Sequence, residues 1–274
     1  MKKLSFLVLI LIGSYVAKSQ TYEKIDNCSS VCIYMYQFYD EHKNPNSLKA
    51  QEMVLEIGEK CSKFYSTYRQ YTDSLFMLNA KVPSNATFSN VRSKTANTSS
   101  NLFSSYYVYK NYPEPNKTLF TAWDMKVNHY KVVEEIDFEW QIDNNAKATI
   151  LGMTCVKATC GFAGRNYEAW FTTEIPISDG PYKFRGLPGL IVRLTDSDKE
   201  HVFELLEIKK TKNIPMYFVD RKYINTNAKG YVTGLEASKA SHIDQLNGLD
   251  YSDESMRSRA ISNVQKRNNF IERF

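Results

Sequence analysis

The sequence predicts a mainly β protein of the α+β class: a twisted antiparallel sheet or half-barrel, with a small helical share that includes a C-terminal helix. Three observations predict this fold. Aromatic residues, which suit pleated and half-buried surfaces, make up 14% of the chain. Short apolar segments alternate with turn residues through most of the chain, as in an antiparallel meander. After Pro215 the apolar residues take helical spacing instead.

The first predicted strand, 31–39, shows the period of two most clearly. Tyr34, Tyr36 and Phe38 alternate along it, which places them on one face. The next candidate, 50–57, is predicted as a strand, although a helix would also fit its sequence. The strands expected in order are 31–39, 50–57, 61–68, 106–110, 118–124, 132–142, 148–159, 167–173, 190–195 and 202–210.

Segments rich in turn-forming residues lie between these strands. The segment 83–100 is rich in Asn, Ser and Thr, so we expect a loop or a weak, mobile helix there. Gly161 to Gly164 predicts a hairpin connection. The segment 196–199, Asp-Ser-Asp-Lys, predicts the turn between the last two strands.

Two segments near the end of the chain, 236–246 and 252–274, have helical spacing and contain no proline. Either a helix packed on the sheet or a frayed tail fits the second segment. The residues expected on one face of that helix are Ile261, Val264, Asn268 and Ile271.

The stretch 178–194 contains several Gly and Pro residues and then a run of apolar residues. Its part 187–190 has the signature of a type II turn, in which Pro188 sets φ at the second position and Gly189 supplies the positive φ of the third. We expect 182–184 to be a short extended piece and the strand after the turn to be buried.

The same turn carries a resemblance to a known family. The six residues 186–191, which include the turn, resemble the hallmark of the GLPGLI family of exported proteins from Bacteroidetes-type bacteria. The resemblance spans most of the chain after residue 19. It implies an exported protein with no generally established activity, and it supplies no catalytic residues to carry over. The motif residues, to which we assign a structural role, are Gly186, Leu187, Pro188, Gly189, Leu190 and Ile191. Further blocks similar to the family lie at 53–58, 62–66, 139–142, 155–158, 164–165, 169–172 and 174–177.

The first 19 residues have the three parts of a secretory signal peptide. Lys2 and Lys3 form a basic start, an apolar run follows to Ala17, and small residues precede Gln20. We expect cleavage before Gln20, which leaves one β-rich domain over 20–274. A retained membrane anchor is the alternative, but the run is short of the ~20 clean apolar residues that a span needs. No later segment is apolar enough to cross a membrane, so we expect a periplasmic or extracellular protein.

The net charge gives no reason to expect a nucleic-acid partner. The chain carries 35 Lys+Arg and 30 Asp+Glu. Three of the lysines belong to the signal peptide, so the mature chain has 32 basic residues against 30 acidic ones. An excess this small does not indicate a basic surface for nucleic acid.

The cysteines all lie in the exported part, where disulfides are permitted. Their number is odd, so at least one thiol stays free or pairs between chains. Cys28 and Cys32 would close a small loop if the chain turned there, whereas Cys155 and Cys160 point to opposite faces of a regular strand. The pairing is therefore open among Cys28, Cys32, Cys61, Cys155 and Cys160.

Three residues allow both a structural and a functional interpretation. We favour Cys160 as a half-buried apolar residue, with a reactive thiol near Arg165 as the alternative. We favour Arg165 as a residue that binds turn carbonyls, with a clamp for an anionic ligand as the alternative. For Trp170 we favour a position in the core or in the wall of a groove, with a stacking platform for a ligand as the alternative. If the turn served a ligand, the backbone N–H groups of Gly189 and Leu190 would form an anion nest.

Sequence motifs for catalysis and metal binding are absent. The histidines have no H-x-x-H or H-E-x-x-H spacing, so no metal site is predicted. The sequence contains no nucleophile elbow, P-loop or dinucleotide fingerprint. We therefore assign no cofactor and no catalytic residue.

The absence of these motifs favours a non-enzymatic function. We expect an exported binding or carrier protein for a peptide or an apolar ligand, because concave sheets cradle ligands in other folds, an argument from analogy of fold alone. One alternative is an accessory subunit of an outer-membrane or secretion complex. The other is an envelope hydrolase or thiol-dependent enzyme that uses dispersed acids or Cys160.

Overall fold

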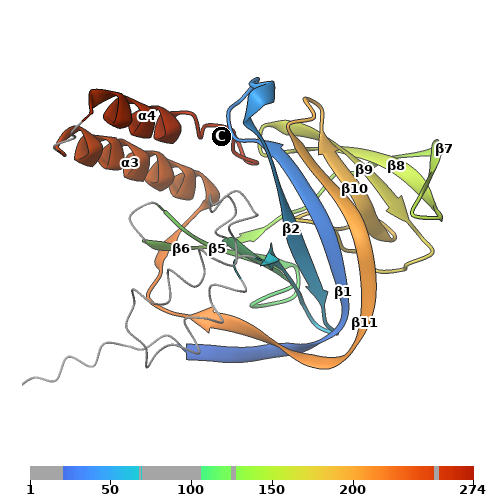
Figure 1. The fold of residues 1–274 in the computed structure, drawn as a ribbon. Helices are drawn as coiled ribbons and strands as arrows, with labels where there is room; N and C mark the ends of the chain where they lie inside the picture. Colours follow the sequence, from blue (N-terminus) through green and yellow to red (C-terminus); the bar gives the residue numbers. More distant parts are fainter. Residues whose placement is uncertain (1–20, 68, 70–105, 125–127, 250–252) are drawn as a thin grey trace, which may run out of the picture.

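The computed structural model describes residues 21–67, 69, 106–124, 128–249 and 253–274. Within them, twelve strands form one sheet with the order β12-β6-β5-β4-β3-β2-β1-β11-β10-β9-β8-β7 (Figure 1). Every pairing is antiparallel except that of β12 with β6. The predicted fold class is confirmed. The predicted signal peptide and the segment 83–100 lie outside the described residues.

The described residues form twelve strands, whereas the sequence predicted ten: two predicted strands correspond to β6, β7 and β8, and β12 was not predicted. The strands are β1 (Thr21–Tyr39), β2 (Leu48–Ile57), β3 (Ser62–Ser66), β4 (Tyr106–Lys110), β5 (Lys117–Trp123), β6 (His129–Glu135), β7 (Gln141–Ile150), β8 (Met153–Phe162), β9 (Arg165–Thr172), β10 (Leu190–Asp196), β11 (His201–Asp220) and β12 (Ile224–Thr226). A short 3-10 turn, η1 (Pro45–Ser47), precedes β2.

The two longest strands, β1 and β11, lie side by side within the sheet and contribute to its curvature. They pair along almost their whole lengths, and the register shifts after Lys24, after Cys28 and after Ile33. Such shifts are β-bulges, which bend a strand and increase its twist. Figure 1 shows both strands bending together, so the sheet curls instead of staying flat.

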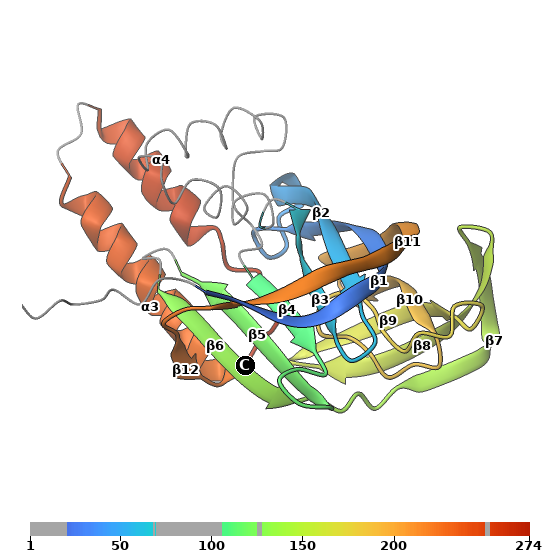
Figure 2. The same ribbon diagram turned by 90° about the horizontal axis from the view of Figure 1, so that it is seen from below.

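The segment 136–140 joins β6 to β7, which lie far apart in the strand order. Five extended residues span at most ~18 Å, so this short link requires two distant parts of the sheet to approach each other. Figure 2 shows the chain running from the end of β6 to the start of β7. The sheet is therefore curled into an open half-barrel, and 136–140 bridges its two ends.

One large core fills the inner face of the half-barrel. Tyr34, Tyr36 and Phe38 contribute to it from β1, as their alternation predicts. Val132 of β6 and Ala158 of β8 belong to the same buried cluster, although their strands are far apart in the sheet. A single cluster with members from both ends is what a curled sheet produces.

The segment between β9 and β10 packs into this core from within. Tyr182 and Phe184 are buried there. The hydroxyl of Tyr34 donates to the backbone carbonyl of Ile191 at 2.8 Å, and the ammonium of Lys110 forms a buried ion pair with Asp179. The inner face is thus covered by side chains and backbone of the chain itself.

Two predicted strands are interrupted in the structure. The predicted strand 132–142 is divided into parts of β6 and β7, because residues 136–140 leave the sheet. The predicted strand 148–159 is divided by a turn at Leu151 and Gly152, which both have positive φ. The sequence concealed this turn because a leucine rarely adopts positive φ.

The turn at 187–190 is not the predicted type II turn. The residue with positive φ is Gly186, at 96°, and not Gly189. A Cβ atom at Gly189 would lie 2.1 Å from the carbonyl oxygen of Thr172. Glycine is required there by close approach of two backbone segments rather than by φ.

The segment 182–184 was predicted to be extended. In the structure it belongs to a tight turn. The backbone N–H of Phe184 donates to the carbonyl of Pro181 at 3.1 Å, and Tyr182 has a φ of 53°. The turn directs both aromatic side chains into the core.

Two helices follow the sheet, α3 (Ala228–Asn247) and α4 (Glu254–Gln265). Each begins at a side chain that accepts a hydrogen bond from the first turn, Asn227 for α3 and Asp253 for α4. Figure 1 shows them packed side by side beyond one end of the half-barrel. Neither of these described helices is long and apolar enough to cross a membrane.

The predicted helix 252–274 is shorter than expected. Helix α4 ends at Gln265, and 266–274 is irregular. Asn268 and Ile271 therefore do not extend the helical face as predicted. The reason is tertiary, because this last segment packs against the sheet through its backbone groups.

Candidate functional site

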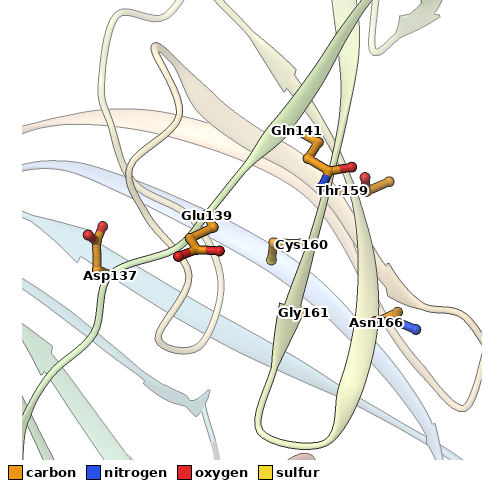
Figure 3. Close-up of a pocket in the computed structure, with 7 residues that line it drawn as sticks. All are labelled: Asp137, Glu139, Gln141, Thr159, Cys160, Gly161 and Asn166. Carbon is orange, nitrogen blue, oxygen red and sulfur yellow. The ribbon is translucent and has the colours of Figure 1, made fainter.

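A pocket opens where the ladder between β7 and β8 stops. The last pair of this ladder is Gln141 with Thr159. Beyond it, the backbone N–H of Trp140 donates to the carbonyl of Phe138 at 2.9 Å. This bond, which spans two residues, turns the chain away from β8, while β8 continues to Phe162. The space between the two segments is the pocket (Figure 3).

The aromatic side chains of the bridging segment anchor it to the core. Phe138 stacks on Phe184 with ring centroids 5.0 Å apart, and Trp140 donates its indole N–H to the loop between β9 and β10 at 2.8 Å. Successive side chains of an extended segment point to opposite sides. Asp137 and Glu139, which alternate with the two aromatics, therefore face the pocket (Figure 3).

The pocket has a volume of about 440 Å³, and ligand sites commonly measure roughly 300–1,000 Å³. Its lining provides two carboxylates, two carboxamides, a hydroxyl and a thiol. Such groups hydrogen-bond a polar ligand, and the carboxylates favour positive charge. The lining residues are Asp137, Glu139, Gln141, Thr159, Cys160, Gly161 and Asn166.

The two acidic side chains of the pocket are exposed and have no ion pair or hydrogen bond to the part of the chain that the structure describes. Their neighbours differ in this respect. Glu134 pairs with the buried Lys183, and Glu168 pairs with Lys157 at 2.7 Å. Unpaired like charges in a concave site produce a negative local potential that attracts cations.

The thiol of Cys160 also lines the pocket. Its side chain is only 6% exposed, and burial raises its pKa to about 12, so the thiol is protonated at neutral pH. The reactive-thiol alternative needs Arg165 beside Cys160, but the register pairs Cys160 with Tyr167 and Arg165 with Phe162. The geometry therefore does not support activation of this thiol by Arg165.

The sequence left the pairing of the cysteines open, and no disulfide joins them in the described structure. All five are buried and free. Cys28 and Cys32 lie on the same strand, β1, which does not turn between them. The small loop that they would close is therefore not formed.

Arg165 lies at the centre of a buried charge cluster. Its guanidinium donates to Asp196 at 2.6 Å and lies 3.4 Å from Glu200. It also donates to the backbone carbonyl of Phe270 at 2.8 Å. The positions that an anionic ligand would take are occupied by acids and a carbonyl of the chain itself.

The same cluster holds the C-terminal segment 266–274 against the β8–β9 hairpin. The hydroxyl of Tyr167 donates to the carbonyl of Ile271 at 3.0 Å, and the backbone N–H of Arg273 donates to the carbonyl of Ala163 at 2.8 Å. Arg165 therefore acts within the fold as an anchor for the end of the described chain.

A group of three acids lies in this region as well. Carboxylate oxygens of Asp196, Asp198 and Glu200 lie within 4.8 Å of one another, a spacing that a metal ion would accept. Two of the three are already compensated, Asp196 by Arg165 at 2.6 Å and Glu200 by Arg273 at 3.1 Å. We assign no metal to this group.

Trp170 lies on the partly exposed face of β9, near the pocket but outside its lining. Its partner on β8 is Lys157, and its indole N–H donates to Glu168 at 2.9 Å. Glu168 is in turn the partner of Thr159, which lines the pocket. Of the two ligand residues suggested by the sequence, neither Arg165 nor Trp170 lines the pocket.

The motif 186–191 serves the core. Leu187, Leu190 and Ile191 are buried. The backbone N–H of Leu190 donates to the carbonyl of Ile175 at 3.1 Å, so it is not available for the anion nest considered from the sequence.

Sequence reasoning missed the acidic wall of the pocket. The signal was present as alternation: acidic residues at 137 and 139 interleave with aromatics at 138 and 140. We interpreted this stretch as part of a continuous strand, and only the break in the ladder turns its polar side into a pocket wall.

Part of this chain is similar to a protein family, and most of it is similar to two solved structures. A family described as "Protein of unknown function (Porph_ging)" matches residues 163–193, which include the turn motif. No curated protein matches the chain. Two solved structures, titled "Structure of PNGF-II in P21 space group" and "Structure of PNGF-II in C2 space group", are similar over 77% of this chain with a TM-score of 0.49 and sequence identities of 16% and 14%. The chain spans about a third of their length, 34% and 33%.

Proposed function

We propose that this chain is an exported binding protein of the cell envelope, and that it holds a positively charged, polar ligand in the pocket between 137–141 and β8. The observation that carries the proposal is the pair Asp137 and Glu139. Both carboxylates line a concave site and have no cationic partner among the described residues. A cationic ligand would supply the charge-assisted hydrogen bonds that the protein does not.

The packing of the half-barrel favours a polar ligand over an apolar one. An apolar carrier needs an unfilled apolar cavity. The inner face is instead occupied by the segment between β9 and β10, with Tyr182, Phe184 and Leu187 fully or almost fully buried.

The chemistry of the lining favours binding over catalysis. Among the seven lining residues, Cys160 is the only thiol, and its pKa of about 12 leaves it protonated. A thiol-dependent enzyme needs a thiolate near neutral pH. The pocket therefore supports non-enzymatic binding better than the thiol-dependent enzyme alternative.

Export is supported by the signal-peptide pattern of residues 1–19. We expect the exported protein to begin at Gln20. N-terminal sequencing of protein recovered from the culture fluid and the periplasm checks this, and a start at Met1 would contradict it.

The binding proposal is tested by titrating the protein calorimetrically with three cationic probes: spermidine, lysine amide and the peptide Ac-Thr-Val-Lys-Val-Thr-NH2. At least one probe is expected to bind, and replacing the lysine of the pentapeptide by glutamate is expected to abolish binding of that peptide. In the variant Asp137→Asn/Glu139→Gln, affinity is expected to fall about tenfold or more, equivalent to at least ~1.4 kcal/mol.

A matched variant controls for general charge. Glu59→Gln/Glu114→Gln also removes two exposed carboxylates, but neither residue lines the pocket. Its affinity for the probes is expected to equal that of the unchanged protein. Equal weakening in both variants would show long-range attraction only and would contradict the proposed site, as would the absence of binding by all three probes.

A further inference from the structure

We infer that the ligand of this pocket is an extended peptide segment with a Lys or Arg side chain, and that its backbone pairs with the open edge of β8 at Cys160, Gly161 and Phe162. The inference rests on the proposed function and names the class of its ligand. The juxtaposition that carries it is an unpaired strand edge beside two unpaired carboxylates, in one pocket.

The edge of β8 is open on the pocket side. Its residues 160–162 pair with β9 through Cys160–Tyr167, Gly161–Asn166 and Phe162–Arg165. On the other side, pairing with β7 begins only at Thr159. Among the described residues, no strand occupies the position beside 160–162. Backbone N–H and C=O groups at such an edge bind an extended peptide by strand addition.

The outer edge of β7 is a weaker candidate for the addition of a peptide strand. Its ladder with β8 shifts register between Asp143 and Lys147. The Asp143 carboxylate accepts hydrogen bonds from the backbone N–H groups of Asn145 and Ala146 at 3.0 and 3.3 Å. A bulge of this kind blunts an edge against added strands, so the regular edge within the pocket is the better docking position.

Gly161 leaves room for the side chain of the added strand. Residues directly opposite each other in a ladder project to the same face. A Cβ atom at Gly161 would meet only the Asn166 side chain, at 3.8 Å. A long side chain on the peptide residue opposite Gly161 therefore has space to extend along the pocket.

The charges of the pocket select which side chain this is. The wall opposite β8 carries Asp137 and Glu139, which have no partner among the described residues, and Gln141 and Asn166 add acceptor oxygens to the lining. A Lys ammonium or Arg guanidinium provides donors and no acceptors, which matches this set. The Cys160 thiol, 6% exposed and lining the same space, has no hydrogen-bond partner in the described structure and provides a further buried polar atom.

The experiment compares peptides that differ only in backbone hydrogen bonding. The probe is Ac-Thr-Val-Lys-Val-Thr-NH2, and its matched forms carry N-methyl groups on the backbone nitrogen of the lysine or of each flanking valine in turn. N-methylation removes one donor and leaves the charge unchanged. We expect the unmethylated peptide to bind about tenfold or more tightly than lysine amide. Because alternate N–H groups of a strand face the same neighbour, methylation should weaken binding at least tenfold at alternate positions and little between them.

A variant of the protein gives a second, independent readout. In Gly161→Thr a β-branched side chain occupies the space above the edge. It is compatible with the strand, because a Cβ meets only the ordinary contact with Asn166. We expect it to weaken binding of the pentapeptide about tenfold and binding of lysine amide clearly less, because only the peptide places a strand residue opposite position 161. Equal weakening of both probes would contradict pairing of the peptide backbone with this edge. Its circular dichroism and urea midpoint serve as the folding check.

The failure of this inference differs from the failure of the proposed function. If the pentapeptide does not bind, or binds no better than lysine amide, or if N-methylation has no effect at any position, the peptide class is wrong. Binding of spermidine or lysine amide that depends on Asp137 and Glu139 would still uphold the cation site. If no probe binds in a manner that depends on these carboxylates, both proposals are wrong.

Discussion

The guanidinium of Arg165 lies 2.6 Å from the carboxylate of Asp196, and the two side chains are only 2% and 1% exposed. Arg165 follows the β8–β9 turn and Asp196 ends β10, so this ion pair joins two corners of the sheet. Through Arg165 the pair also reaches the C-terminal segment at the carbonyl of Phe270. It is one of several contacts that hold the C-terminal segment against the sheet.

Replacing Arg165 by Gln is expected to reduce the free energy of unfolding by about 3–5 kcal/mol, because it leaves the buried Asp196 charge without its partner. Urea unfolding at pH 7 measures the change. The matched control is Arg193→Gln, whose pair with Glu204 is 47% and 45% exposed. That variant is expected to lose less than about 1 kcal/mol. Equal losses would show that burial does not decide the strength of the Arg165 pair.

Gly189 and Gly152 show two different physical reasons why a position requires glycine. Gly189→Ala places a Cβ 2.1 Å from the Thr172 carbonyl oxygen, and we expect a loss of about 2 kcal/mol or more from this clash. Gly152→Ala meets no atom within 4 Å but requires a φ of 77°, and we expect about 1 kcal/mol from backbone strain. Urea midpoints compare the two. A larger loss at Gly152 would mean that the backbone near Thr172 relaxes easily.

His201 is expected to make the protein sensitive to mild acid. Burial, with Arg165 and Arg273 nearby, lowers the pKa of His201 from 6.5 to about 3. The native pKa lies below the unfolded one, so as the pH falls below 6.5 the unfolded state takes up a proton that the native state does not. The contribution of neutral His201 to the free energy of unfolding is therefore present in full above pH 6.5. It is lost as the pH falls towards 3, at up to about 1.4 kcal/mol per pH unit.

The variant His201→Gln tests this assignment, since Gln offers an acceptor to the Tyr36 hydroxyl that now bonds the His201 ring at 2.7 Å and does not titrate. Free energies of unfolding of both proteins are measured from pH 7.5 to pH 4. We expect the advantage of the unchanged protein to shrink steadily below pH 6.5. Two parallel curves would show that His201 is not the responsible group.

The five thiols are expected to react slowly in the native protein. Burial raises the pKa of Cys160, and also that of Cys32, to about 12. Labelling with a thiol reagent between pH 5 and pH 9 should be slow in buffer and should reach all five thiols in urea. Cys160→Ser should fold normally and leave native labelling unchanged. Fast labelling at pH 6 that disappears in Cys160→Ser would instead revive the thiol-enzyme alternative.

Local patterns accounted for much of the fold. The alternation of Tyr34, Tyr36 and Phe38 predicted both a strand and its buried face, and the hairpin at 161–164 lies where the glycines indicated. These predictions succeed because side-chain alternation and turn preference are properties of a few adjacent residues. Predictions that depended on what a segment packs against were less successful, as the irregular 266–274 and the turn at 182 show.

By itself, the sequence determined the fold class, most of the strands and the positions at which turns occur, because each of these is decided within a few residues of backbone. Only the tertiary structure decided the partners of Arg165, which lie 31 and 104 residues away at Asp196 and Asn269. It also decided that Asp137 and Glu139 line a pocket. Both outcomes depend on the register of neighbouring strands and on the curvature that brings the ends of the sheet together, and these are set by packing of the whole core rather than by any local pattern.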